Sequence, residues 1–237
     1  MTVLTKQDIY NFVTSLLNGS TVEQSLFDSL LDQAQFFVEG RKQWVALRKT
    51  DNSQTISPAD TFLTPKDLPS DFKEWYSGGS QFIPVILSDA SYTRRVPYFE
   101  IPEGMKLMYK DMSQRFYCDY VNNKIYFCGP VSEAYTIFQQ YIYQPTLISS
   151  GDSQTWVTPF QKFTRILGLL IAVYWKLGVD YDVISNAQAN NQAAQAKEML
   201  DIMDAWDLRL QQSMQAGLDP FGALQSNAWQ SGQMPIY

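Results

Sequence analysis

Residues 118–175 read CDYVNNKIYFCGPVSEAYTIFQQYIYQPTLISSGDSQTWVTPFQKFTRILGLLIAVYW. The stretch opens with the alternation typical of a β-hairpin and closes with a hydrophobic run at helical spacing. Between them, Gln144-Pro145 interrupts the pattern, because proline cannot donate to a central sheet ladder. We therefore interpret residues 144–159 as a linker in which the chain leaves an inserted sheet and rejoins a set of helices.

The two cysteines lie in the hairpin of this stretch. Val121-Asn-Asn-Lys124 predicts a two-residue turn, since asparagine tolerates the positive φ that such turns need. That register pairs Cys118 with Phe127 and places Cys128 opposite Tyr117. Because side chains alternate between the faces of a strand, the two thiols point apart and remain free. Free thiols suit a reducing compartment.

Upstream of the linker, residues 43–145 are predicted to form antiparallel β structure. Pro84 and Pro97 restrict their segment, residues 81–102, to edge strands. Further strands are predicted in MKLMYK (105–110), QRFYCDYV (114–121), KIYFCG (124–129) and EAYTIFQQYIYQP (133–145). The last strand has aromatic residues on both faces, so we expect the sheet to be partly covered on each side.

Two helices are predicted before the sheet. Thr5-Lys-Gln-Asp8 resembles a capping box, and the first helix ends at Asn18-Gly19. Ser20 or Thr21 is expected to cap the second helix, which ends at Gly40. The short connection predicts a helical hairpin.

Two more helices are predicted after the linker. The third begins near Pro159 and ends at Gly178, and its apolar residues occupy nearly all sides, which indicates a central, buried helix. The fourth runs from about Ser185 to Gln215, with a first half rich in Ala and Gln. Residues 218–237 lack a period and predict an extended tail that is mobile in the isolated subunit and ordered in an assembly.

Together these elements predict an α+β fold. We expect a helical bundle of two N-terminal plus two C-terminal helices, with an inserted antiparallel β domain and an extended C-terminal tail. The predicted limits are 1–42 for the N-terminal helical hairpin, 43–158 for the β domain and its linkers, 159–217 for the C-terminal helices and 218–237 for the tail.

Composition excludes several classes of activity. The 237 residues carry 18 Lys and Arg against 24 Asp and Glu, a net charge of -6 that argues against a general DNA coat. The absence of histidine excludes Ser-His-Asp and Cys-His catalysis and histidine-ligated metals. The N-terminal sequence MTVLTKQDIYNF predicts no secretory signal, and the apolar run from Ile166 to Trp175 is too short to span a bilayer.

Four small groups of residues are candidate sites of chemistry. They are Asp201, Asp204 and Asp207; Asp180 and Asp182; Gly78-Gly79-Ser80; and Arg94-Arg95 beside Tyr92 and Tyr98. We interpret the three aspartates at 201–207 as a solvated acidic face, and Asp180 and Asp182 as turn or capping residues. The Gly-Gly-Ser segment is interpreted as a flexible loop, because it lacks the lysine of a P-loop. The two arginines are expected to make intersubunit ion pairs or none. We predict no catalytic, cofactor-binding or metal-binding residues, and no enzyme activity.

Several segments resemble the head-to-tail adaptor, or connector, proteins of tailed bacteriophages. The segments are LPSDF (68–72), NNKIYFCGP (122–130), YIYQPTLIS (141–149) followed by VTPFQKFTRILGLLIAVYW (157–175), and a long last helix with an irregular aromatic tail. The resemblance implies a helical bundle with an inserted β domain and a homo-dodecameric ring below the portal. It also implies that the tail binds the portal, through Leu218, Phe221, Trp229, Pro235, Ile236 and Tyr237.

The resemblance implies a structural adaptor of the phage neck that joins the portal to the tail and forms part of the DNA channel. The implied partners are the portal protein and the tail or nozzle proteins. DNA would pass through without specific binding, and no membrane would be bound. The location would be the head–tail interface of the virion, after assembly in the host cytoplasm. Two alternatives stay open: an aromatic-rich β binding module directed at a host or surface, and a carboxylate-only glycosidase.

Overall fold

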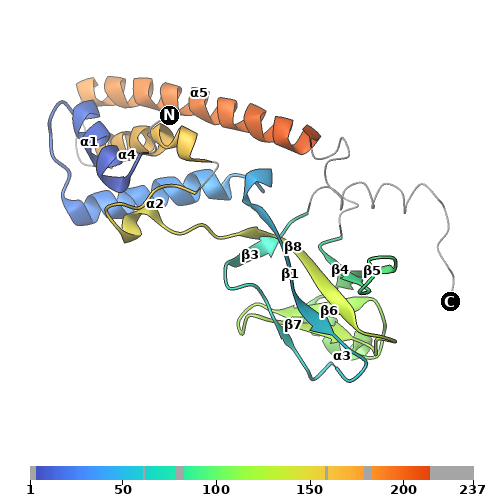
Figure 1. Ribbon diagram of the computed structural model, residues 1–237. Coiled ribbons are helices and arrows are strands. Elements are labelled where there is room, and N and C mark those ends of the chain that lie inside the picture. The colour runs from blue at the N-terminus through green and yellow to red at the C-terminus, as the bar shows by residue number, and fades with distance from the viewer. Residues whose placement is uncertain (1–3, 61, 78–82, 158–159, 179–182, 214–237) are drawn as a thin grey trace. The chain divides into compact units, whose positions relative to one another are not determined.

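The computed structural model describes residues 4–60, 62–77, 83–157, 160–178 and 183–213. The chain divides into two compact units, one formed by residues 1–46 with 145–237 and the other by residues 47–144. We call the first the helical unit and the second the β unit (Figure 1).

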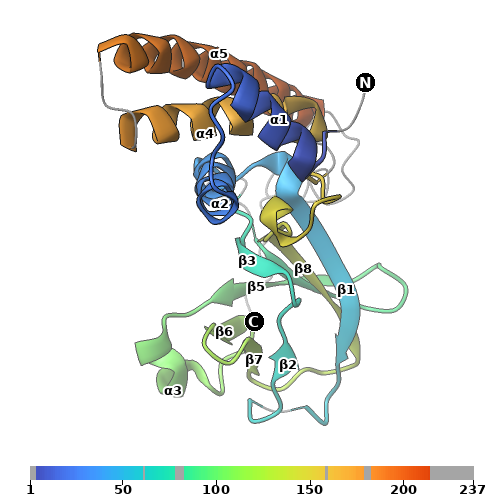
Figure 2. The ribbon, with the colours of Figure 1, turned by 90° about the vertical axis from the view of Figure 1, so that its left-hand side faces the viewer.

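The helical unit is built around one buried helix. Its helices are α1 (Lys6–Leu16), α2 (Gln24–Gly40), α4 (Arg165–Gly178) and α5 (Val183–Ser213). Helix α4 packs against α1, α2 and α5, and every residue from 166 to 173 is buried (Figure 2). The apolar residues on nearly all sides of α4 account for this central position, so that prediction is confirmed.

The N-terminal caps agree with the sequence at α1 but not at α2. Thr5 and Asp8 form the predicted capping box, in which the Thr5 backbone N–H donates to the Asp8 carboxylate at 2.9 Å. Helix α2 begins later than expected, because its cap is Glu23, whose carboxylate accepts the N–H groups of Ser25 and Leu26. The expectation of Ser20 or Thr21 as the cap is wrong.

The segment after Gln144 is held on α2 by buried polar side chains. Gln35 donates to the carbonyl of Thr146 at 3.1 Å and accepts the N–H of Ile148 at 3.0 Å. The indole of Trp156 donates to Glu39 Oε1 at 2.8 Å, and Gln35 donates to the same oxygen at 2.9 Å. These bonds satisfy polar groups that would be costly to bury unpaired, so the segment is part of the helical unit's core.

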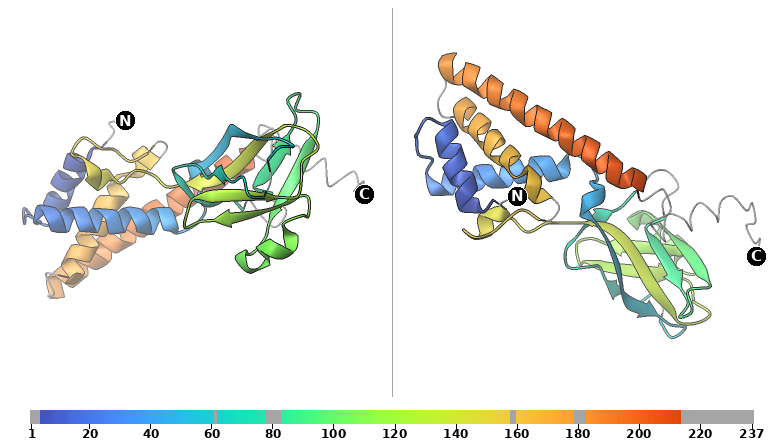
Figure 3. Two further views of the ribbon diagram at one scale, coloured as in Figure 1. Left: turned by 90° about the horizontal axis from the view of Figure 1, so that it is seen from below. Right: turned by 45° about the horizontal axis from the view of Figure 1, so that its top comes forward.

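The β unit contains one strongly curved sheet (Figure 3). The strands are β1 (Arg48–Ile56), β2 (Lys66–Asp67), β3 (Phe72–Trp75), β4 (Val85–Ser88), β5 (Arg95–Glu100), β6 (Arg115–Asp119), β7 (Lys124–Cys128) and β8 (Tyr135–Tyr143). Seven of them follow the order β1-β8-β4-β5-β6-β7-β2, and β3 pairs with β8. The amide of Gln54 on β1 donates to the carbonyl of Asp67 on β2 at 2.6 Å, which nearly closes the sheet into a barrel.

The interior of this barrel is filled by apolar side chains. They come from all strands of the seven-strand path or from the residues that follow them: Ile56, Leu68, Val85, Leu87, Tyr98, Phe116, Cys118, Ile125, Phe127, Val131, Tyr135 and Ile137. A smaller cluster on the outer side joins Ile101, Tyr117 and Cys128, with Tyr109 packed against it. The barrel interior is therefore a packed core, as expected for a small barrel.

The expected fold class is wrong. The protein is a mixed α/β protein dominated by a nearly closed, barrel-like sheet of seven strands, with five helices among the described residues. The sheet is not purely antiparallel, because β5 and β6 run parallel and need a crossover connection. That crossover contains a 3-10 turn (Glu103–Met105) and α3 (Lys106–Tyr109), where MKLMYK had predicted a strand.

The predicted turn of the 118–128 hairpin is also wrong. Asp119 pairs with Lys124, which leaves a four-residue loop in place of the two-residue turn. The Asp119 carboxylate accepts the N–H of Asn122 at 3.0 Å, and Asn123 adopts a φ of 56°. Aspartate and asparagine favour such loops because their side chains bond nearby backbone groups and tolerate positive φ.

The prediction of free thiols is nevertheless confirmed. The register differs from the expected one by two residues, so each side chain keeps its predicted face. Cys118 lies in the barrel interior and Cys128 in the outer cluster, and both are free and buried.

Candidate functional site

Some of the predicted residues lie outside the described ones. These are the six portal-binding candidates Leu218, Phe221, Trp229, Pro235, Ile236 and Tyr237, together with Gly78-Gly79-Ser80, Asp180 and Asp182. The predicted extended tail, residues 218–237, also lies outside the described residues. The candidate sites described below are therefore built from other residues.

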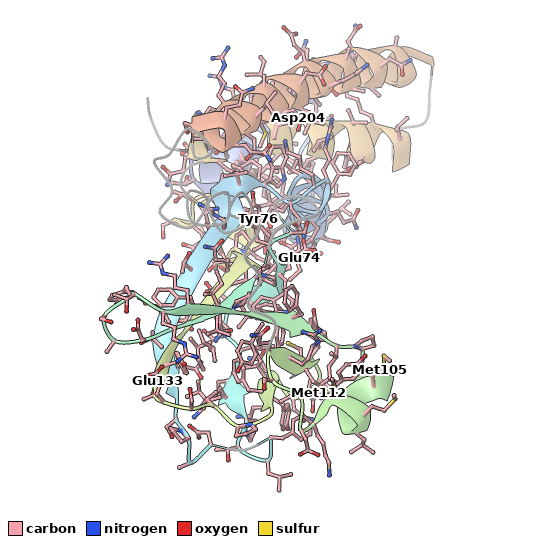
Figure 4. The ribbon with its side chains drawn as sticks, turned by 90° about the vertical axis from the view of Figure 1, so that its right-hand side faces the viewer. Glu74, Tyr76, Met105, Met112, Glu133 and Asp204 are labelled. Carbon is pink, nitrogen blue, oxygen red and sulfur yellow. The ribbon has the colours of Figure 1, made fainter. Side chains whose placement is uncertain are left out.

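The aspartates of α5 do not form the predicted solvated acidic face. Asp201 is exposed, but Asp204 pairs with Arg41 at 2.8 Å and Asp207 pairs with Lys42 at 3.1 Å. Asp207 is only 3% exposed. Basic residues directly after α2 thus bind this part of α5, which sequence spacing did not predict (Figure 4 labels Asp204).

Arg94 makes an ion pair within the chain. Its guanidinium lies 3.0 Å from the carboxylate of Glu133, and both side chains are exposed. The expectation that Arg94 makes no ion pair is therefore wrong, and an intersubunit pair stays a prediction.

The side of α5 opposite its buried residues forms an exposed row. The buried residues recur every three or four positions: Ala189, Gln192, Ala196, Leu200, Met203 and Asp207. The opposite side is exposed at eight positions of the same spacing, and these define the α5 row: Ala187, Asn191, Ala194, Glu198, Asp201, Ala205, Leu208 and Gln212. The row extends for about 38 Å at the usual helical rise. It holds two carboxylates, and the exposed side chains of Lys197 and Arg209 lie beside it.

Strand directions bring a second set of residues to one end of the barrel. β5 and β8 both run antiparallel to β4, and β6 runs parallel to β5. The C-terminal ends of these strands, at Glu100, Tyr143 and Asp119, therefore share one end of the barrel. Phe72 lies there as well, because β3 pairs with the end of β8. We call this end the barrel mouth and define it by Asp71, Phe72, Trp75, Glu100, Tyr120 and Tyr141.

Aromatic rings pack together at the barrel mouth. The ring centroid of Phe72 lies 4.7 Å from that of Trp75 and 5.7 Å from that of Tyr141. Tyr120 stacks on Phe72, with centroids 6.1 Å apart and planes at 22°. Trp75 in turn packs edge-on against Phe116 of the barrel interior at 5.6 Å. The exposed ring of Tyr120 is thus connected to the core through Phe72 and Trp75, which keeps it in a fixed position.

Two carboxyl groups border these rings and accept tyrosine hydroxyls. Tyr141 donates to Asp71 Oδ1 at 2.8 Å, and Tyr120 donates to Glu100 Oε1. Partial burial, followed by these hydrogen bonds, raises the pKa of both tyrosines, so both stay protonated. Burial also raises the pKa of Asp71, but the hydrogen bonds from Lys49 and Tyr141 outweigh it and hold that pKa below its ordinary value of 3.8.

One buried polar side chain lies further inside the barrel. Gln139 precedes Tyr141 by two residues on β8 and shares its face, because side chains alternate along a strand. It is 0% exposed, and neither its amide oxygen nor its amide nitrogen has a hydrogen-bond partner within the described part of the chain. An unpaired buried amide costs about 1–3 kcal/mol, so a bound water or ligand group would stabilise this position.

The two cysteine thiols are not activated by their surroundings. Burial raises the pKa of Cys128 to about 11 and also raises the pKa of Cys118, so both thiols stay protonated at neutral pH. Across the described ranges, no cluster of three or more metal-ligating side chains is present. Likewise, none of the described helices combines the length and apolar character needed to cross a bilayer.

Sequence reasoning missed the barrel mouth. The sequence shows only that an acidic residue lies directly beside an aromatic one in Asp71-Phe72, Phe99-Glu100 and Asp119-Tyr120. These pairs are far apart in the sequence, and only the strand order brings them to one end of the barrel.

Neither the models of known protein families nor the curated proteins contain a match to this chain.

Proposed function

We propose that the protein is a structural adaptor of a phage neck, in which a homo-dodecameric ring joins the portal to the tail and forms part of the DNA channel. The observation that carries the proposal is the α5 row. Three alanines and two neighbouring carboxylates lie among uncharged residues along about seven helical turns, and the exposed Lys197 and Arg209 lie beside the row. Such a surface suits the wall of a channel, because carboxylates repel phosphates and oppose DNA sticking.

The sequence segments that resemble phage adaptors add support. The helical bundle with an inserted sheet gives no support, since the fold is a barrel-dominated α/β structure. What remains is the long last helix with its exposed row, and the aromatic residues after it. In this proposal Leu218, Phe221, Trp229, Pro235, Ile236 and Tyr237 bind the portal, and tail or nozzle proteins dock on the other side of the ring.

The ring itself is tested by native mass spectrometry of the full chain, alone and with the portal protein encoded beside its gene. Adaptors of this kind often stay monomeric until they dock, so ring formation is tested in the sample that contains both the chain and the portal protein. We expect twelve copies bound to the portal ring. A chain that stays monomeric and leaves the portal unchanged in the mixture would overturn the proposal.

The channel assignment is tested with labelled duplex DNA across a salt series, measured by fluorescence anisotropy on the portal-bound ring. We expect no appreciable binding at physiological salt. The double variant Glu198→Lys with Asp201→Lys should bind DNA in a salt-dependent way, because it places cations in the row. The control, Glu74→Lys with Asp111→Lys, makes the same charge change at exposed β-unit sites. Equal DNA binding by both double variants, or tight binding by the wild type, would contradict the assignment.

A second candidate function is an aromatic-rich β binding module. The observation that favours it is the barrel mouth, where four rings and two carboxyl groups meet at one end of the sheet. This function concerns the β unit alone, so it neither requires nor excludes the ring.

A further inference from the structure

The barrel mouth offers the aromatic ring of Tyr120 to solvent, with two partly buried rings beside it. Tyr120 is 55% exposed, and its ring stacks on Phe72, which is itself only partly buried. Trp75, also partly buried, meets Phe72 edge-on. Rings that are fixed by packing bind a flat apolar ligand surface at a low cost in conformational entropy. The ligand must therefore have at least one apolar face.

Hydrogen-bond acceptors surround this surface. The carboxyl groups of Asp71 and Glu100 each hold one tyrosine hydroxyl. A carboxylate offers about four acceptor positions, so both keep capacity for the hydroxyl groups of a ligand. A ligand with many hydroxyl groups matches this set.

Both nucleic acids and neutral hydroxyl-rich ligands can stack on aromatic rings, and the local charge favours the second class. Single-stranded nucleic acid binds aromatic platforms that lie in a positively charged groove. Here Lys49 already pairs with Asp71 at 2.5 Å and lies 4.1 Å from the ring centroid of Tyr143. Glu100 and Asp71 would face the phosphates, so the charge disfavours nucleic acid and favours a neutral, hydroxyl-rich ligand.

We infer that the barrel mouth is a binding site for a neutral carbohydrate chain. The sugar's apolar face stacks on Tyr120 and the adjoining rings, and its hydroxyl groups donate to Glu100 and Asp71. The mouths of β-barrels are common positions for ligand sites, and small barrels are known to bind oligosaccharides. The inference deepens the second candidate function, on which it rests, and is independent of the ring.

The opposite end of the barrel provides matched controls. Tyr92, in the connection between β4 and β5, is 54% exposed, close to the value for Tyr120. Glu133, just before β8, accepts the hydroxyl of Tyr135 at 2.8 Å, as Glu100 accepts that of Tyr120. Figure 4 places Glu133 away from Glu74 and Tyr76, which mark the β3 end of the sheet. Substitutions at Tyr92 and Glu133 therefore remove an exposed aromatic ring and a hydroxyl-accepting carboxylate at the end of the barrel away from the barrel mouth.

The test is isothermal titration of the full chain with maltohexaose, cellohexaose and the hexamer of N-acetylglucosamine. We expect one of the three to bind, and Tyr120→Ala and Glu100→Gln each to weaken that binding by about tenfold or more. Tyr92→Ala and Glu133→Gln should bind as the wild type does. Near-ultraviolet circular dichroism confirms that each variant keeps its packing.

Three results would overturn the inference. They are the absence of binding by all three sugars, equal binding by Tyr120→Ala and the wild type, and tighter binding of a single-stranded thymidine oligonucleotide than of any sugar. Ring formation is measured separately, by native mass spectrometry with the portal, so failure of the carbohydrate proposal would not affect the test of the ring.

Discussion

Helices α4 and α5 pack against each other, yet the chain buries them in different ways. Every residue of α4 from 166 to 173 is buried, whereas α5 buries one residue in three or four and leaves the α5 row exposed. Helix α4 is stabilised by apolar contacts with three other helices. Helix α5 adds ion pairs to Arg41 and Lys42. The difference indicates that α4 serves stability, while much of α5 is available for another purpose.

The largest effect is expected in α4. Ile171 is 0% exposed, so Ile171→Ala leaves a cavity and should lower the free energy of unfolding by about 2–5 kcal/mol. Urea unfolding followed by the helical circular dichroism signal measures this change. A loss below about 1 kcal/mol would show that α4 is not the central packing element of the helical unit.

The next effect tests how α5 is held. The buried carboxylate of Asp207 pairs with Lys42 and accepts the N–H of Ala46 at 3.4 Å. Asp207→Ala removes both interactions and should cost about 1–3 kcal/mol in the same assay. Asp201→Ala, on the exposed row, is the matched control and should change stability little. Equal effects of the two variants would mean that the ion pairs do not hold α5.

A smaller effect is expected where α4 meets α1. A Cβ atom at Gly168 would lie 2.5 Å from Cδ1 of Phe12, so Gly168→Ala forces that ring to move. Overpacking of this kind costs about 1–3 kcal/mol, and the better helix propensity of alanine returns about 1 kcal/mol. The net result should be a loss of about 1 kcal/mol. A stabilised variant would show that the contact of Phe12 with α4 is loose.

The smallest effect belongs to the exposed side of α5. Ile202 is 53% exposed, so Ile202→Ala should change the free energy of unfolding by less than about 0.5 kcal/mol. This substitution is chemically identical to Ile171→Ala, so the pair isolates burial as the cause. A loss as large as that of Ile171→Ala would remove the contrast between the two helices.

The sequence predicted local secondary structure better than it predicted which segments lie side by side in the fold. The helices at both ends, the capping box of Thr5 and the opposite faces of the two cysteines all follow from local spacing. The turn at Asn122-Asn123 was misplaced, because asparagine tolerates positive φ in several loop types. The segment 105–110 was misread as a strand, because a short apolar alternation does not distinguish a strand from a single helical turn.

The candidate sites show the same limit. The sequence identified the first half of α5 as rich in Ala and Gln, and part of the α5 row lies there. The pairing of Asp204 and Asp207 with Arg41 and Lys42 was not predicted, because the partners are more than a hundred residues apart.

The sequence by itself determined most of the helices and strands and the faces of the two cysteines, because hydrophobic periodicity and capping act over a few residues. Only the tertiary structure decided that β5 and β6 run parallel, that the sheet nearly closes, and that Asp71, Glu100 and Tyr120 share one end of it. The physical reason is that the order of strands depends on long-range packing and crossover connections, on which local spacing carries no information.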